Sequence, residues 1–142
     1  MQVFIPYPSP IDVAKCLDPK RMKRQLYEYE ILKKAARDYE LYGGRLHPLT
    51  KMYSGNLDWL KYYTKCLESY VKGDGQAEFY SSLADACRPD WMTDELCDQH
   101  KRRLYTKDPE KYPQFAEYGT SEENWYVIDG QIVKYVNCKK VK

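Results

Sequence analysis

The stretch DPKRMKRQLYEYEILKKAARDYELYGG, residues 18–44, sets the framework of the fold because it has the pattern of one long helix. Asp18 is a good N-cap residue, and Pro19 suits the first helical position, where its nitrogen needs no hydrogen bond. Apolar residues then recur with a 3.6-residue period, which indicates one buried face. These residues are Met22, Leu26, Tyr29, Leu32, Ala36 and Tyr39. We predict a helix from about Asp18 to Tyr42 that ends at Gly43–Gly44.

Proline, glycine and capping residues divide the rest of the chain into short elements. Prolines make residues 1–10 extended, and Ser9 as N-cap with Pro10 begins a short helix. Further helices are predicted at about 48–71, 76–86 and 92–106, the last one capped by Thr93. The alternating sequence WYVIDGQIVKYV around Asp129–Gly130 predicts a β-hairpin. The expected fold is mainly α, a compact single-domain helical bundle with a small C-terminal β-hairpin.

Length and composition indicate one globular domain over residues 1–142. The 142 residues are 43% hydrophobic and 31% charged, which is typical of a chain that buries one core. No apolar run approaches the roughly 18 residues of a membrane span, so we expect no contact with a membrane. The start, MQVFIPYPSP, lacks the basic and apolar regions of a secretory signal. We therefore expect a cytoplasmic protein, nucleoid-associated if bacterial, and the pattern is compatible with a monomer.

Several chemistries have no matching motif in the sequence. The five cysteines include no C-x-x-C pair, and the two histidines, His47 and His100, lie far apart, so no zinc site is predicted. Reduced thiols packed as small core residues are expected instead. No P-loop, G-x-S-x-G, zinc-deaminase signature or two-metal acid cluster is present. Any enzymatic activity is expected to need no metal and no cofactor.

Basic residues and tyrosines are distributed unevenly along the chain. The net charge is only +2, but Lys and Arg concentrate in residues 15–24 and 101–107, whereas 78–98 is acidic. The chain also has 15 tyrosines, whose rings fill cores and stack on bases. We expect most of them to be core residues and one or two to stack on bases.

One acidic residue, Glu28, follows the basic block of the long helix directly. Arg21, Arg24, Gln25 and Glu28 stand at i, i+3, i+4 and i+7, so they share one stripe beside the apolar face. Glu28 at the edge of the core is a candidate catalytic carboxylate held against a polyanion. The alternative is a surface Arg24–Glu28 ion pair, worth a few tenths of a kcal/mol.

Two further clusters combine basic and aromatic residues. The stretch GGRLHPLTKMY, residues 43–53, places a loop before a helix N-terminus, and such a terminus favours the binding of phosphate. The candidate DNA contacts in this stretch are Arg45, His47 and Lys51. The stretch HKRRLYTKDPEKY, residues 100–112, is the basic end of a helix. Its candidate DNA contacts are His100, Arg102, Arg103 and Lys107. Together with the Glu28 stripe, these clusters predict a nucleic-acid surface.

The same three stretches, in this order, resemble the pyrimidine-dimer DNA glycosylase family of the phage endonuclease V type, and more closely its bacterial relatives. The resemblance covers roughly residues 3–112, which leaves 113–142 as a divergent C-terminal extension. It implies a DNA-repair glycosylase with AP lyase activity that flips a damaged or modified base out of double-stranded DNA. A pyrimidine dimer is the first expectation for that base.

The resemblance also implies roles for particular residues. In the family, the N-terminal amine attacks the sugar of the damaged nucleotide and forms a Schiff base, and a helical glutamate assists. The matching glutamate is Glu28, and because Gln2 is too bulky for ordinary methionine removal, the amine is that of Met1. The sequence differs from the phage enzyme at Tyr27, where that enzyme has arginine. A non-catalytic DNA-binding module and a protein-interaction domain on the same fold are the alternatives.

Overall fold

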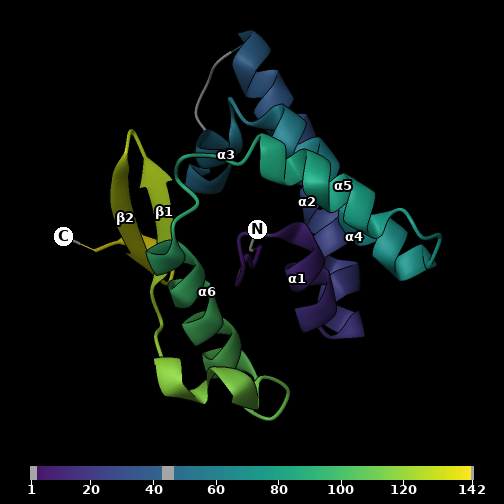
Figure 1. Ribbon diagram of the computed structural model, residues 1–142. Coiled ribbons are helices and arrows are strands. Elements are labelled where there is room, and N and C mark those ends of the chain that lie inside the picture. The colour runs from purple at the N-terminus through teal and green to yellow at the C-terminus, as the bar shows by residue number, and fades with distance from the viewer. Residues whose placement is uncertain (1–2, 43–46, 142) are drawn as a thin grey trace.

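The computed structural model describes residues 3–42 and 47–141 as a bundle of helices with a small sheet at its C-terminal side (Figure 1). In chain order the elements are α1 (Pro10–Cys16), α2 (Pro19–Tyr42), α3 (Pro48–Tyr53), α4 (Leu57–Lys72), α5 (Ala77–Ala86), α6 (Asp94–Lys107), the 3₁₀ helix η1 (Pro113–Tyr118), β1 (Asn124–Ile128), β2 (Gln131–Val136) and β3 (Lys139–Lys140). The expected fold class, mainly α with a small C-terminal hairpin, is confirmed.

The long helix α2 forms as its capping and periodicity predict. The Asp18 carboxylate accepts a hydrogen bond from the backbone N–H of Arg21 at 3.3 Å, which satisfies one of the free donors of the first turn. The positions Met22, Tyr29 and Leu32 of the apolar stripe are buried. The predicted stop at Gly43–Gly44 lies outside the described residues, and the described helix reaches Tyr42.

The single helix predicted at 48–71 is wrong, because the chain divides there into α3 and α4. Gly55 between them has φ +81°, a left-handed conformation that interrupts the helical backbone and that glycine adopts without steric cost. Gly73, with φ +69°, ends α4 close to residue 71, where the helix was predicted to end. The short α3 therefore turns away from the axis of α4 and supports the sheet.

The caps of the remaining helices agree with expectation in part. Thr93 accepts a hydrogen bond from the N–H of Leu96 at 3.2 Å and begins α6 as predicted. Ser9 precedes α1 but makes no side-chain cap, because its hydroxyl lies 3.1 Å from that of Ser81 on α5. It links α1 to α5 instead of capping α1.

The C-terminal hairpin pairs β1 with β2 in antiparallel register around the turn Asp129–Gly130, as predicted. Both turn residues have positive φ, 52° and 77°, which matches the twist of a tight hairpin. A short strand, β3, pairs with the far edge of β2. β1 packs against α3 and α6, and the N–H of Val127 lies 3.5 Å from the sulfur of Met52.

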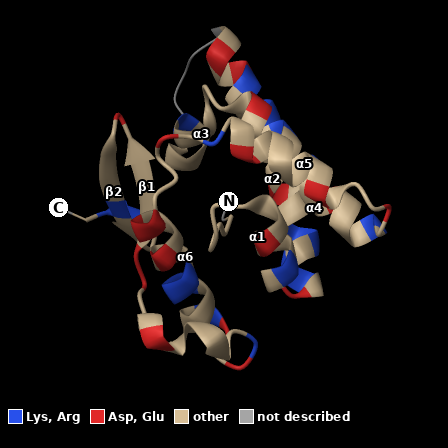
Figure 2. Ribbon diagram, in the orientation of Figure 1, with Lys and Arg blue, Asp and Glu red and all other residues tan. Residues whose placement is uncertain are grey.

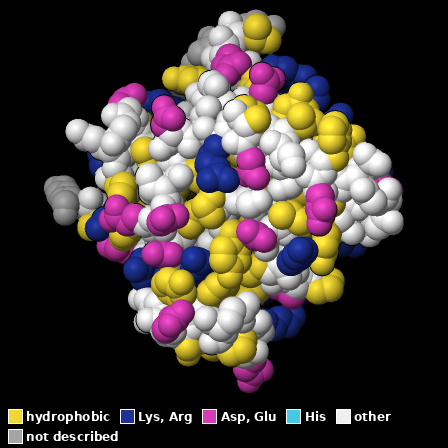
Figure 3. All heavy atoms as spheres, in the orientation of Figure 1, with side chains coloured by type: hydrophobic (Ala, Val, Ile, Leu, Met, Phe, Trp, Pro, Cys, Tyr) yellow, Lys and Arg dark blue, Asp and Glu magenta, His cyan; other side chains and the backbone are white. Residues whose placement is uncertain are grey.

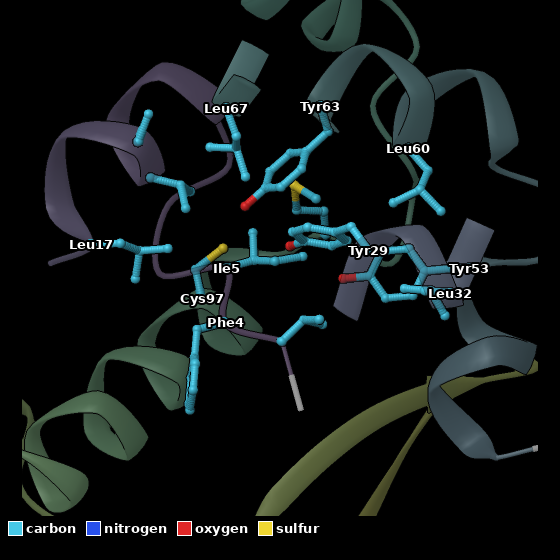
Figure 4. Close-up of a cluster of buried hydrophobic side chains, with 14 of the residues drawn as sticks. Phe4, Ile5, Leu17, Tyr29, Leu32, Tyr53, Leu60, Tyr63, Leu67 and Cys97 are labelled. Atoms are coloured by element: carbon cyan, nitrogen blue, oxygen red, sulfur yellow. The ribbon is translucent and has the colours of Figure 1, made fainter. Parts of the chain in front are cut away.

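Aromatic side chains from α2, α3 and α4 fill the centre of the core (Figure 4). The rings of Tyr29 and Tyr63 meet edge to face at 4.9 Å, and those of Trp59 and Tyr63 lie 4.7 Å apart. Tyr53 is fully buried as well. The core therefore accounts for part of the high tyrosine content, as expected, and Figure 4 shows Phe4 and Ile5 of the N-terminal segment entering the same cluster.

Candidate active site and DNA-binding face

A basic cavity of about 420 Å³ opens between the start of α2 and the end of α6. Its walls carry Lys20, Arg21 and Arg24 from α2 and Lys107 and Lys111 from the end of α6 and the turn after it. The carboxylates of Glu28 and Asp108 and the side chains of Phe4 and Gln25 complete it. Figure 2 shows basic residues on the first turns of α2 and along α6, whereas the face seen in Figure 3 mixes both signs of charge. The cavity is thus a local concentration of positive charge.

Glu28 is half-buried in this cavity, at the edge of the α2 face that enters the core. Within residues 3–42 and 47–141 its carboxylate has no hydrogen bond and no ion pair closer than 4.0 Å. The alternative Arg24–Glu28 surface pair therefore does not form in the described part of the chain. The structure leaves the Glu28 carboxylate available for a ligand in a basic environment.

Arg21 belongs to a network of ion pairs and ring contacts that joins α2 to the turn after α6. Its guanidinium lies 3.5 Å from Asp18 and 3.6 Å from Asp108, and it stands over the ring of Tyr112. Tyr112 also donates a hydrogen bond to Asp18. Burial alone would raise the pKa of Asp18, but the hydrogen bonds from Tyr112 and the Arg21 N–H, with the charges of Lys111 and Arg21, hold that pKa below its usual range. Arg21 therefore shapes the cavity wall with a charge that is already partly compensated.

Three other cations of the cavity have no carboxylate partner within 4.0 Å in the described part of the chain: Lys20, Arg24 and Lys107. The pKa of Lys107 is lowered by burial and then by the charges of Arg103 and Arg21. Uncompensated cations that repel one another attract an anion, and phosphate is a group that they bind well. These three side chains are the phosphate-binding candidates of the cavity.

Gln25, a predicted DNA contact, is instead buried against the N-terminal segment, with 2% of its surface exposed. Its amide oxygen accepts from the N–H of Phe4 at 3.1 Å, and its amide nitrogen donates to the Phe4 carbonyl at 2.5 Å. The same nitrogen lies 3.1 Å from the Tyr29 hydroxyl. These bonds occupy the amide, so Gln25 holds the chain rather than a phosphate.

His100, also a predicted DNA contact, faces the N-terminal segment from the opposite side. Its Nδ1 accepts a hydrogen bond from the N–H of Ile5 at 2.7 Å, and its ring meets that of Phe4 edge to face. Burial, and then the charge of Arg103, lower the pKa of His100 to about 4. His100 is therefore a neutral internal acceptor at ordinary pH, and it cannot act as a cation for DNA.

Arg102 and Arg103 bind the C-terminal part of the chain instead of pointing into the cavity. Arg102 donates to the carbonyl of Tyr118 at 2.9 Å. Arg103 is 8% exposed, and it donates to the carbonyl of Ser121 at 2.9 Å and to the side chain of Asn124 at 3.2 Å. Their charges hold η1 and the hairpin on α6, so their expected role as DNA contacts has no support in the geometry.

The remaining predicted site residues lie away from the cavity or outside the described structure. His47 precedes α3, where its Nδ1 accepts from the N–H of Leu49 at 3.1 Å, and its ring meets that of Tyr126. Lys51 is exposed on α3 and lines a different groove, beside the hairpin. Met1 and Arg45 lie outside the described residues.

Sequence reasoning missed Lys20, Lys111 and Asp108 as parts of the site. A signal existed for Lys20, because it stands four residues before Arg24 and eight before Glu28, on the same side of the helix. Lys111 and Asp108 had no such signal, since a turn carries them to the start of α2 from almost 90 residues away in the sequence.

In the described ranges, no group of three or more His, Cys, Asp or Glu side chains is arranged to hold a metal ion. None of the helices in those ranges is both long and apolar enough to cross a membrane.

Comparison with known proteins identifies one family. Residues 1–69 match the family model described as pyrimidine dimer DNA glycosylase, whereas no curated protein and no solved structure matches the chain. The match includes α1, α2 and α3 and most of α4, and thus Gln25 and Glu28, but it stops short of α6. The resemblance drawn from the sequence is confirmed over this part. Over residues 1–69, the chain is similar to the pyrimidine dimer DNA glycosylase family.

Proposed function

We propose that the protein is a DNA glycosylase with AP lyase activity, and that it acts on damaged pyrimidines in double-stranded DNA. One observation carries the proposal: among residues 3–42 and 47–141, the Glu28 carboxylate has no partner, and it lies in a cavity lined by Phe4 and by three cations without carboxylate partners in those ranges. Lys20, Arg24 and Lys107 bind the phosphates around the lesion, and the damaged nucleotide leaves the base stack so that its sugar reaches Glu28.

The nucleophile of the proposed reaction is the α-amine of the chain. Residue 1 precedes Phe4 by three residues, so the length of the chain keeps this amine within roughly 11 Å of Phe4, which lines the cavity. An α-amine has a pKa of about 7.7–8.0, so roughly a tenth of it is neutral and nucleophilic near pH 7. No other unmodified amine of a protein is as nucleophilic at that pH without a special environment.

The proposed chemistry has two stages. The amine nitrogen bonds to C1′ of the sugar, the glycosidic bond breaks, and the base leaves with the bonding electron pair and takes up a proton. Loss of the nitrogen proton and opening of the sugar ring give an imine, and removal of a C2′ proton then expels the 3′ phosphate. Glu28 stabilises the positive charge that develops on the sugar and carries these protons. We propose that the protein acts as a monomer.

Borohydride trapping tests the proposal, since borohydride reduces the imine to a stable covalent adduct. Wild-type protein is mixed with ultraviolet-irradiated duplex DNA, with undamaged DNA and amine-blocked protein as references. Glu28→Gln should abolish the adduct. The matched control is Glu30→Gln, on the same helix, where the carboxylate is exposed and paired with Lys33 at 2.7 Å.

The expected result is an adduct that requires the lesion and the free amine, maps to residue 1 and survives Glu30→Gln. Binding without any adduct would favour a non-catalytic DNA-binding module, and no binding at all would remove the DNA proposal. An adduct on other modified bases but not on irradiated DNA would keep the chemistry and correct the substrate.

A further inference from the structure

The N-terminal segment is held by side chains from two different helices, and it lies between them in Figure 1. Gln25 on α2 bonds to both backbone groups of Phe4, the N–H at 3.1 Å and the carbonyl at 2.5 Å. A single amide thereby imitates the paired hydrogen bonds that a neighbouring β-strand would give. His100 on α6 accepts from the next N–H, that of Ile5, at 2.7 Å.

The two contacts fix the segment from opposite sides. Successive N–H groups of an extended chain point in opposite directions, which matches one partner on α2 and the other on α6. The side chains of Phe4 and Ile5 are 7% and 1% exposed, so apolar packing adds to the polar contacts (Figure 4). Rotation or sliding of the segment would leave buried polar groups without partners, which is costly.

We infer that Gln25 and His100 are positioning residues that set where the N-terminal amine of the chain stands relative to Glu28. The inference rests on the proposed function, because it concerns the amine of that reaction. Gln25 lies three residues before Glu28 on α2, so the helix that carries the carboxylate also holds the nucleophile's segment. A displacement of about 1 Å at a reacting atom can cost on the order of 100-fold in rate.

The test uses Gln25→Met, which keeps the length of the side chain and removes both bonds to Phe4. Its matched control is Gln99→Met: Gln99 is equally buried, at 2%, but its amide holds Ser121 and Glu123 near the hairpin. Single-turnover rates of borohydride trapping on abasic-site duplex DNA, at saturating enzyme, are compared with the affinity for the same DNA. Hydrogen exchange at the Phe4 amide reports the clamp without any dependence on activity.

For Gln25→Met we expect trapping at least 10-fold slower, an affinity within about 2-fold of wild type, and faster exchange at Phe4. Gln99→Met should keep the wild-type trapping rate. Equal trapping rates for the two variants, or unchanged exchange at Phe4 in Gln25→Met, would overturn the clamp alone. A wild-type protein that forms no adduct would instead overturn the proposed function, and the positioning role with it.

Discussion

Acid should destabilise the protein through His100 before its carboxylates titrate. In the fold the pKa of His100 is about 4, against 6.5 for an ordinary histidine, because burial disfavours the charged ring and the charge of Arg103 repels it. The unfolded chain therefore takes up a proton near pH 6.5, whereas the folded chain resists it until about pH 4. The contribution of neutral His100 to the free energy of unfolding is therefore complete above about pH 6.5 and is lost as the pH falls toward 4. At about 1.36 kcal/mol per pKa unit, the loss approaches 3 kcal/mol.

Urea unfolding at several pH values between about 7 and 4.5 measures this loss. His100→Asn is the comparison, because an amide oxygen can still accept from Ile5 but does not titrate. The free energy of unfolding of wild type should fall by about 2–3 kcal/mol more than that of the variant over this range. The pKa of His47 is also lowered by burial, so the variant should keep part of the slope. Parallel curves for the two proteins would refute the buried neutral His100.

Four further substitutions test the DNA-binding face and the hairpin, with Arg102→Ala as the control for Arg24→Ala. Arg24→Ala should reduce the slope of log affinity against log salt by about 0.9, the value for one phosphate contact, whereas Arg102→Ala should leave the slope unchanged, as binding titrations would measure. Tyr27→Ala should weaken binding to DNA with an extruded base by about 1–3 kcal/mol, because this ring, which is 67% exposed and precedes Glu28 in the sequence, can stack on a base; thermal unfolding should not change. Gly130→Ala should cost about 1 kcal/mol in urea unfolding, because φ there is +77°.

Local signals in the sequence predict most of the helices and the hairpin. Asp18 with Pro19 marks the start of α2, and positive φ at Asp129 and Gly130 follows from the residue types of the turn. The break at Gly55 is harder to predict, because an isolated glycine is tolerated within a helical pattern. The packing of β1 against the short α3 is a tertiary contact, and no local sequence pattern predicts it.

The candidate site can likewise be predicted only where a local sequence pattern determines it. Glu28 and Arg24 lie on one helix face, and helical periodicity alone brings them together. The roles of Gln25 and His100 depend on partners in the N-terminal segment, and for His100 that partner is 95 residues away in sequence. The presence of an arginine or lysine in the sequence does not show whether its side chain is exposed to solvent or, as at Arg103, hydrogen-bonded to a carbonyl group of the same chain.

The contacts of Arg103 indicate which parts of the molecule unfold together. The acceptors of this nearly buried guanidinium come from the segment that leads into β1, at Ser121 and Asn124. Detachment of the hairpin would leave these donors without partners in a poorly hydrated place, at a cost of about 1–3 kcal/mol for each unsatisfied group. The sheet and the second half of α6 should therefore unfold together as one cooperative unit, and a shortened protein that lacks the strands should lose order in α6 as well.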